Sequence, residues 1–301
     1  MGAEDDSAEL KLKIGPSELL RYNWVINSVT DSTGKDQGRA FKLTSDSGSN
    51  MTLLLRGQPG RRDKDSMTVS IRVKDQVYTD KRSVDASISE MYVSKTRVKC
   101  TDNGKVVIDS DNDIGLDRLG NYQEHFKNQE NAEMRVELDA AGRQSDVQGD
   151  PTIVDSIKAS GAQGIFPILP AKSVKVGESW EDSFSMPKIG EFKLARAAVV
   201  KSKMTFVKWE TKDGRKLAHI DVASSWDNQD LRGENATGML VEITRVDGRG
   251  SGNCLFDPAT GHFVEGNLSF AIFYRIDGEH KGQSTGLEVS GKTRLMYSLQ
   301  K

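Results

Sequence analysis

The residues that come nearest to a chemical site by type and spacing are the carboxylates of an acidic run at 109–117, DSDNDIGLD. Asp109, Asp111 and Asp113 alternate along this run, a pattern that can surround a hard cation such as calcium with oxygen ligands. The run departs from an EF-hand loop, because Ile114 occupies the sixth position and no glutamate occupies the twelfth. The three aspartates are therefore a calcium candidate, and a solvated acidic loop at a strand end is the alternative.

No other spacing supports catalysis or cofactor binding. The chain has no nucleophile elbow, no phosphate-binding loop and no dinucleotide fingerprint. Its four histidines are scattered, outside any spacing typical of metal ligands: His125, His219, His262 and His280. Carboxylates are too numerous to single out an acid–base pair, so we name no catalytic or cofactor-binding residues. The sequence favours a protein that is not an enzyme.

The chain contains one glycine-rich run of the kind that can cradle phosphate. Gly248–Gly252, GRGSG, joins two apolar alternating segments and does not open a helix. Phosphate loops need the helix N-terminus that follows them. The run therefore predicts a flexible hairpin between two strands.

Two cysteines, Cys100 and Cys254, are too few for a disulfide scaffold and lie outside any zinc-binding spacing. Each is expected near the end of a strand, so a disulfide between them is one prediction, and it would need an oxidising compartment. Two buried free thiols are the alternative.

Composition limits the partners of this protein. The 301 residues carry 42 Lys and Arg against 44 Asp and Glu, a net charge of −2. That balance argues against nucleic acid or an anionic membrane surface as a partner, since both select basic faces. No apolar run approaches the roughly 18 residues of a membrane-spanning helix. The first ten residues, MGAEDDSAEL, show neither the basic nor the apolar part of a signal peptide.

The first half of the chain alternates between apolar and polar residues, which is typical of half-buried strands. Such patterns occur at Leu10–Ile14, Leu20–Ile26 and Met67–Val73. A Ser/Asp/Gly loop is predicted to separate a strand at Phe41–Leu43 from one at Met51–Leu55. Connections of hairpin length predict antiparallel neighbours.

A crossover is expected between the two halves. Asp150 and Pro151 form a helix start, with Asp as N-cap and Pro at the first helical position, so a short helix is predicted at 151–163. Pro167 and Pro170 lack backbone donors, which excludes the following stretch from a central strand or a helix interior. The segment 150–180 is therefore expected to link two β-rich halves.

The second half returns to alternating strands up to the C-terminus. We expect a mainly β fold of antiparallel meanders in two halves joined by one short helix, arranged as a curved half-barrel or a sandwich. The expected division is a disordered leader at 1–8, an N-terminal β half at 9–149, the linking segment at 150–180 and a C-terminal β half at 181–301. Whether the two halves form one domain or two stays open.

Several turn and crossover residues resemble a known group. The quoted segments are Val136–Gly142 (VELDAAG), Leu169–Pro170, Val176–Trp180 (VGESW) and Phe256–Gly261 (FDPATG). Together they resemble uncharacterised β-rich proteins exported by bacteria, which are often lipoproteins. The resemblance implies an exported, periplasmic or envelope-attached protein, with a cytoplasmic location as the alternative. It implies no activity and no catalytic residues.

Three functions follow from these observations. The first is a non-enzymatic exported binding or envelope-associated protein, since curved antiparallel sheets can enclose a cavity for a lipid or another hydrophobic molecule. The aromatic residues that could line such a cavity, or simply fill the core, are Trp24, Trp180, Trp209, Trp226, Phe270, Phe273 and Tyr274. The second is a structural module that binds an envelope protein through exposed sheet edges. The third and weakest is a hydrolase acting on an envelope polymer.

Overall fold

The computed structural model describes residues 6–36, 39–59, 66–86, 91–100, 106–110, 133–149, 164–189, 192–234, 240–280 and 283–300. All regular structure in these ranges is β. The fifteen strands are β1 (Ser7–Ala8), β2 (Leu19–Asp36), β3 (Arg39–Gln58), β4 (Ser66–Ala86), β5 (Met91–Cys100), β6 (Val106–Ser110), β7 (Met134–Asp139), β8 (Gln144–Gln148), β9 (Val174–Lys175), β10 (Ser179–Ile189), β11 (Phe192–Lys212), β12 (Arg215–Glu234), β13 (Leu240–Asp257), β14 (His262–His280) and β15 (Gln283–Leu299).

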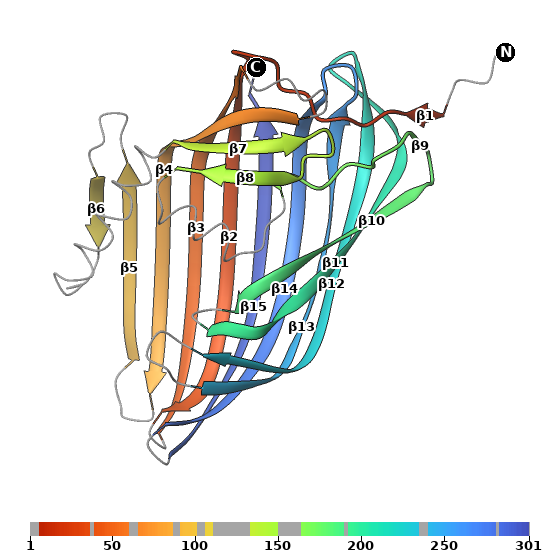
Figure 1. The fold of residues 1–301 in the computed structure, drawn as a ribbon. Coiled ribbons are helices and arrows are strands. Elements are labelled where there is room, and N and C mark those ends of the chain that lie inside the picture. The colour runs from red at the N-terminus through yellow and green to blue at the C-terminus, as the bar shows by residue number, and fades with distance from the viewer. Residues whose placement is uncertain are drawn as a thin grey trace.

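Thirteen of these strands form one antiparallel sheet, drawn in Figure 1 as a strongly curved wall. The order along the sheet is β10-β11-β12-β13-β14-β15-β2-β3-β4-β5-β6, and β7 with β8 adds to β4. Each run is a meander of sequential neighbours, which confirms the prediction of antiparallel meanders. The last strand, β15, pairs with β2 from Gly286 to Leu299, so the two predicted halves share one continuous sheet.

The strands are long because the apolar and polar alternation persists over many residues. In β11, 21 residues alternate between buried and exposed positions, with Val200, Met204 and Phe206 on the buried side. A strand of that length extends about 65–70 Å, and such strands must twist and coil to keep one face covered. One face of the sheet, the inner face, therefore holds the core.

Three segments cover the inner face at one end of the sheet: the chain before β2, the β7–β8 hairpin and residues 164–170 (Figure 1). Leu10, Leu12 and Ile14 are buried there, as the alternation predicted. They are not part of a strand, because the Leu12 N–H donates to the Ala140 carbonyl and the Lys13 N–H to the Gly261 carbonyl. The prediction of a strand at this place is therefore wrong.

Other boundaries also differ from the sequence predictions. Ser7 and Ala8, assigned to a disordered leader, pair with β9 as β1. The loop predicted between Leu43 and Met51 is a continuous part of β3, and its Ser45, Ser47 and Ser49 pair with β2. The predicted helix at 151–163 lies outside the described residues. In the ranges that the structure describes, no helix is long and apolar enough to cross a membrane.

The glycine-rich run Gly248–Gly252 lies in the middle of β13, where it pairs with β12 on one side and β14 on the other. The hairpin predicted there is wrong. By contrast, the turns predicted after Leu138 and after Phe256 are present, and Gly142 and Gly261 have left-handed φ angles of 87° and 78°. Only glycine adopts that conformation without strain.

Candidate functional site

Residues 164–170, named here the strap, cross the inner face at its covered end. Pro167 and Pro170 keep the strap from joining a sheet ladder, so its other polar groups need specific partners. The Leu169 N–H donates to the Ala141 carbonyl at 2.9 Å, and the Trp180 indole N–H donates to the Ile168 carbonyl at 2.7 Å. The strap is thus tied to the β7–β8 turn on one side and to β10 on the other.

Phe166 of the strap is the centre of a buried aromatic cluster. Its ring lies 5.0 Å from the ring of Tyr22, 4.9 Å from that of Phe263 and 5.2 Å from that of Tyr297, between centroids. Trp24 completes the group at 6.0 Å. Aromatic pairs at these separations add about 0.5–1.5 kcal/mol each beyond the area they bury. One strap residue therefore links β2, β14 and β15.

Beside this cluster the strap and the inner face border a cavity of about 230 Å³ that is open to solvent on one side. The apolar side chains that line it from the sheet include Phe184, Met204, Val222, Leu268, Phe270 and Leu295. The polar residues on the lining are Asp182, Ser202 and Ser224. A mostly apolar cavity with a few polar groups is the usual form of a small-molecule site, although this one is below the usual range of about 300–1,000 Å³.

The three polar residues form one row across β10, β11 and β12. The Ser202 and Ser224 hydroxyls share a hydrogen bond of 2.9 Å, and Arg143 donates to the Asp182 carboxylate at 2.9 Å. Each of these polar groups therefore has a partner, which limits the free energy lost when the cavity excludes water. The pairs also leave the cavity without an unpaired charge.

Away from the strap the cavity adjoins a second apolar cluster on the inner face of β10 to β14, named here the apolar wall. Its buried members include Phe192, Leu194, Trp226, Leu231, Ile243 and Ile276. Phe184 and Phe270 line the cavity and also pack against this cluster. A ligand chain that leaves the cavity along the inner face would therefore meet more apolar surface.

Glycines on β13 make room for the large rings of this wall. A Cβ atom at Gly248 would lie 2.1 Å from the Trp226 ring, and one at Gly250 would lie 2.7 Å from the Phe270 ring. Neither distance is possible without a shift of the ring or the strand. The rings thus lie across β13 because it has no side chains at these positions. In the sequence, only the two-residue spacing of the glycines points to this role, and it does not show which rings lie over them.

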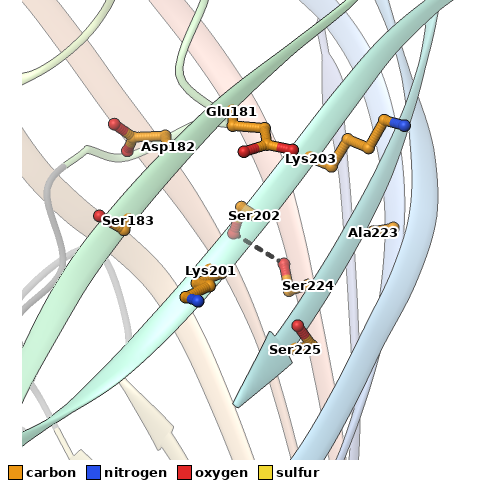
Figure 2. A pocket seen from close by; sticks show the side chains of 9 residues that line it. All are labelled: Glu181, Asp182, Ser183, Lys201, Ser202, Lys203, Ala223, Ser224 and Ser225. Carbon is orange, nitrogen blue, oxygen red and sulfur yellow. Dashed lines mark hydrogen bonds between the residues drawn. The ribbon is translucent and has the colours of Figure 1, made fainter.

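A second hollow, of about 550 Å³, lies where β10, β11 and β12 run side by side (Figure 2). Asp182, Ser202 and Ser224 line both this hollow and the cavity. The other side chains of the hollow alternate with these three along the strands, and they include Glu181, Lys201 and Lys203. Glu181 and Lys203 are register partners, so opposite charges face each other across the strands. Because its exposed side chains are mainly charged or polar, this outer hollow is no site for a hydrophobic molecule.

The calcium candidates and the scattered histidines gain no support as a site from the described residues. Asp109 lies on β6, whereas Asp111 and Asp113 lie outside the described residues, so the calcium site stays a prediction. In the part of the chain that is described, no group of three His, Cys, Asp or Glu side chains could hold a metal ion. His219 lies on β12 between Glu210 at 3.1 Å and Asp221 at 3.3 Å, and His262 lies 3.3 Å from Glu18.

Cys254 is a free thiol, fully buried on β13. Burial raises the pKa of this thiol from its usual 9.0 to about 12, and burial likewise raises the pKa of the neighbouring Tyr297 hydroxyl. Cys100 ends β5, which is six strand-to-strand steps from β13 along the sheet. A disulfide needs Cα atoms within about 7 Å, so this arrangement favours the free-thiol alternative for Cys254.

Comparisons with known proteins show no family for this chain. No family model matches the sequence, and no curated protein does. Among solved structures, one titled for lipid–protein interactions in lipovitellin aligns at 11% identity and a TM-score of 0.42. The alignment covers 96% of this chain and 26% of that one, so this chain spans about a quarter of lipovitellin's length. An outer membrane channel from Pseudomonas putida F1 aligns at 8% identity over 100% of both chains, with a TM-score of 0.23. The translocator domain of the autotransporter NalP from Neisseria meningitidis aligns at 5% identity over 93% of this chain and 88% of that one, with a TM-score of 0.17.

Proposed function

We propose that this protein binds a hydrophobic small molecule without chemical conversion, with the apolar end of the ligand in the cavity beneath the strap. The observation that carries the proposal is the cavity itself, about 230 Å³ lined by aliphatic and aromatic side chains. Burying apolar ligand surface there contributes about 25 cal/mol per Å². The adjoining apolar wall extends the same surface beyond the cavity, so a chain longer than the cavity gains further contacts.

The proposal includes a place in the bacterial cell envelope, either periplasmic or attached. Its support is the resemblance of the turn and crossover segments to exported β-rich proteins. A binding protein in that compartment would keep a poorly soluble molecule out of water. The alternative is that the protein binds its ligand in the cytoplasm.

The test is binding of the fluorescent hydrophobe N-phenyl-1-naphthylamine, followed by its emission on titration. We expect saturable binding with a dissociation constant in the micromolar range. Phe184→Glu, which places a charge on the cavity lining, should weaken binding at least tenfold, because a buried unpaired carboxylate strongly disfavours apolar contact. The matched control is Ser183→Glu, one residue away on the exposed side of β10, which should bind as the parent does.

Absence of saturable binding in the parent protein would end the proposal, and so would equal binding by the two variants. Circular dichroism and a melting curve for each variant show whether it is folded. A defect that appears only in a folded Phe184→Glu protein assigns the probe to the cavity.

A structural or protein-interaction module is the second candidate, and β10 is the observation in its favour. Within the described strands β10 pairs only with β11, which leaves one edge for a partner strand. Pro187 within β10 lacks an N–H donor, and the edge exposes charged residues such as Glu181 and Lys188, features that discourage strand addition. Native mass spectrometry of protein from its own host separates the two: a bound small molecule supports a carrier, and a stoichiometric protein partner supports the module.

A further inference from the structure

We infer that the ligand is an amphiphile whose polar part is uncharged and rich in hydroxyl groups, such as a glycosyl group. This inference rests on the proposed function, because it concerns the polar end of the ligand whose apolar end lies in the cavity. It comes from the inner face of β2, β3 and β15, which continues the apolar wall but differs from it in chemistry.

Hydroxyl side chains dominate this part of the inner face, named here the hydroxyl wall. Its members are Ser28, Thr30, Ser32, Ser45, Ser47, Ser49 and Thr293. On β2 the three hydroxyl residues continue the two-residue alternation of Tyr22 and Trp24, which pack beneath the strap. The same face of the same strands thus changes from aromatic to hydroxyl within a few residues.

The register places the two walls in direct contact. Phe270, on the lining of the cavity, is the pairing partner of Thr293, and Thr293 is in turn the partner of Ser28. Ser28 pairs with Ser47 on the next strand. A single cross-strand row therefore leads from the cavity to the hydroxyl wall in steps of about 4.8 Å. A ligand chain in the cavity would have its polar end within reach of this wall.

The hydroxyl wall carries no charged side chains, and this favours an uncharged polar group on the ligand. Between Leu20 and Gly34 on β2, and between their register partners Phe41 and Leu55 on β3, the inward positions that continue this alternation are all uncharged, and so are their partners on β15 and β14. The next pair in the alternation, Asp36 and Arg39 at the end of the β2–β3 hairpin, has opposite charges. The carboxylate of Asp182 on β10 is paired with Arg143. On β4 the register partners of Ser47 and Ser45 are Asp80 and Arg82.

Serine and threonine hydroxyls both donate and accept hydrogen bonds, which suits ligand hydroxyls that do the same. An ionic group in this place would lose hydration and find no opposite charge on the wall in return. Bonds such as the one of 2.6 Å between the Ser28 and Thr293 hydroxyls can be exchanged for bonds to a ligand with little change in their number. The wall therefore fits a sugar-like group better than a phosphate, a carboxylate or an ammonium group.

The experiment is displacement of bound N-phenyl-1-naphthylamine by amphiphiles that share a dodecyl chain and differ in the polar group. Dodecyl maltoside is compared with dodecanoate, dodecyltrimethylammonium and dodecylphosphocholine, all below their micelle-forming concentrations. We expect the maltoside to displace the probe at a concentration about tenfold lower than any of the charged or zwitterionic compounds, a difference of about 1.4 kcal/mol. Near-ultraviolet circular dichroism at each end point shows that the protein stays folded.

The variant that tests the wall combines Ser28→Ala, Ser47→Ala and Thr293→Val, which removes hydroxyl groups from neighbouring strands. It should bind the probe as the parent does but lose the preference for maltoside. Its control is Ser183→Ala with Ser225→Ala, two hydroxyl residues of the outer hollow, which should keep that preference.

The outcomes separate the two proposals. A probe that does not bind the parent protein overturns the proposed function and this inference together. A probe that binds, with all dodecyl compounds displacing it equally or an ionic one displacing it best, overturns the inference alone. A preference for maltoside that survives the triple substitution assigns that preference elsewhere and also overturns the inference.

Discussion

The apolar wall and the hydroxyl wall belong to one sheet and share one pattern of alternating side chains, yet they present different side chains to the inner face. On β10 to β14 the inward residues form a closed cluster with Trp226 and Ile243 buried. On β2 and β3 the inward residues below the strap are mostly serine and threonine. Apolar side chains at those positions would have extended the core around the whole curve. The polar end of the proposed ligand would account for this difference.

The strap ties β2, β14 and β15 together at the covered end of both walls, and this link can be broken. Phe166→Ala removes the ring that touches Tyr22 on one side and Phe263 on the other. Large-to-small substitutions of a buried phenylalanine cost about 3–5 kcal/mol in the free energy of unfolding. We expect a loss of that size in chemical denaturation.

Phe273→Ala is the control, because Phe273 lies on the outer side of β14, with the Arg245 guanidinium 5.3 Å from its ring centroid. Its loss should stay near or below about 1 kcal/mol. Equal losses in the two variants would contradict the central position given to Phe166.

The apolar wall depends on missing side chains as well as present ones. Gly248→Ala places a methyl group where the Trp226 ring lies, since the Cβ would be 2.1 Å from that ring. Overpacking of this kind costs about 1–3 kcal/mol. Gly286→Ala on β15 is the matched control, with its nearest neighbour at 3.4 Å, and it should change stability by less than about 0.5 kcal/mol. A shift in the tryptophan emission of the first variant, absent in the second, would show that the ring has moved.

Part of this comparison was predictable from the sequence. Strands such as those at Leu20–Ile26 and Met67–Val73 were predicted because an apolar residue recurs at every second position against one buried face. That signal disappears where the inner face is not apolar. Ser45–Ser49 is therefore predicted as a loop, although it is a strand interior. Gly248–Gly252 is predicted as a hairpin for another reason: its glycines carry no side chains, and rings from neighbouring strands supply the apolar surface there.

The rest depends on contacts between residues far apart in the chain. Leu10–Ile14 has strand periodicity, but its backbone bonds go to the turns at Ala140 and Gly261, which no local pattern reveals. The cavity needs the strap, β10 and β15 at one place, and the pairing of β15 with β2 brings the two ends of the chain together. The sequence could suggest that an apolar cavity exists, but it could not show which residues line that cavity.

Cys254, buried in the core beneath the strap, offers a test that depends on pH. Because burial raises the pKa of its thiol to about 12, the folded protein keeps the thiol neutral where the unfolded chain ionises near 9. The resulting contribution to stability is complete below pH 9 and declines as the pH rises toward 12. Each pH unit in that window removes about 1.4 kcal/mol. Between pH 9 and 10.5 the parent protein should therefore lose about 2 kcal/mol more than Cys254→Ala. Parallel pH profiles of the two proteins would show that burial does not disfavour the thiolate at this position.

The smallest expected effect concerns the hydroxyl wall, where Ser28 and Thr293 share a hydrogen bond of 2.6 Å between β2 and β15. A net contribution of about 0.5–1.5 kcal/mol is usual for such a bond. Ser28→Ala or Thr293→Val alone should lower the free energy of unfolding by about that amount, because each leaves one hydroxyl without its partner. The double variant should cost less than the sum of the two, since no unpaired hydroxyl remains, and the difference gives a coupling of about 0.5–1 kcal/mol. Additive losses would mean that water already satisfies both hydroxyls, and the wall would then be hydrated in the ligand-free protein.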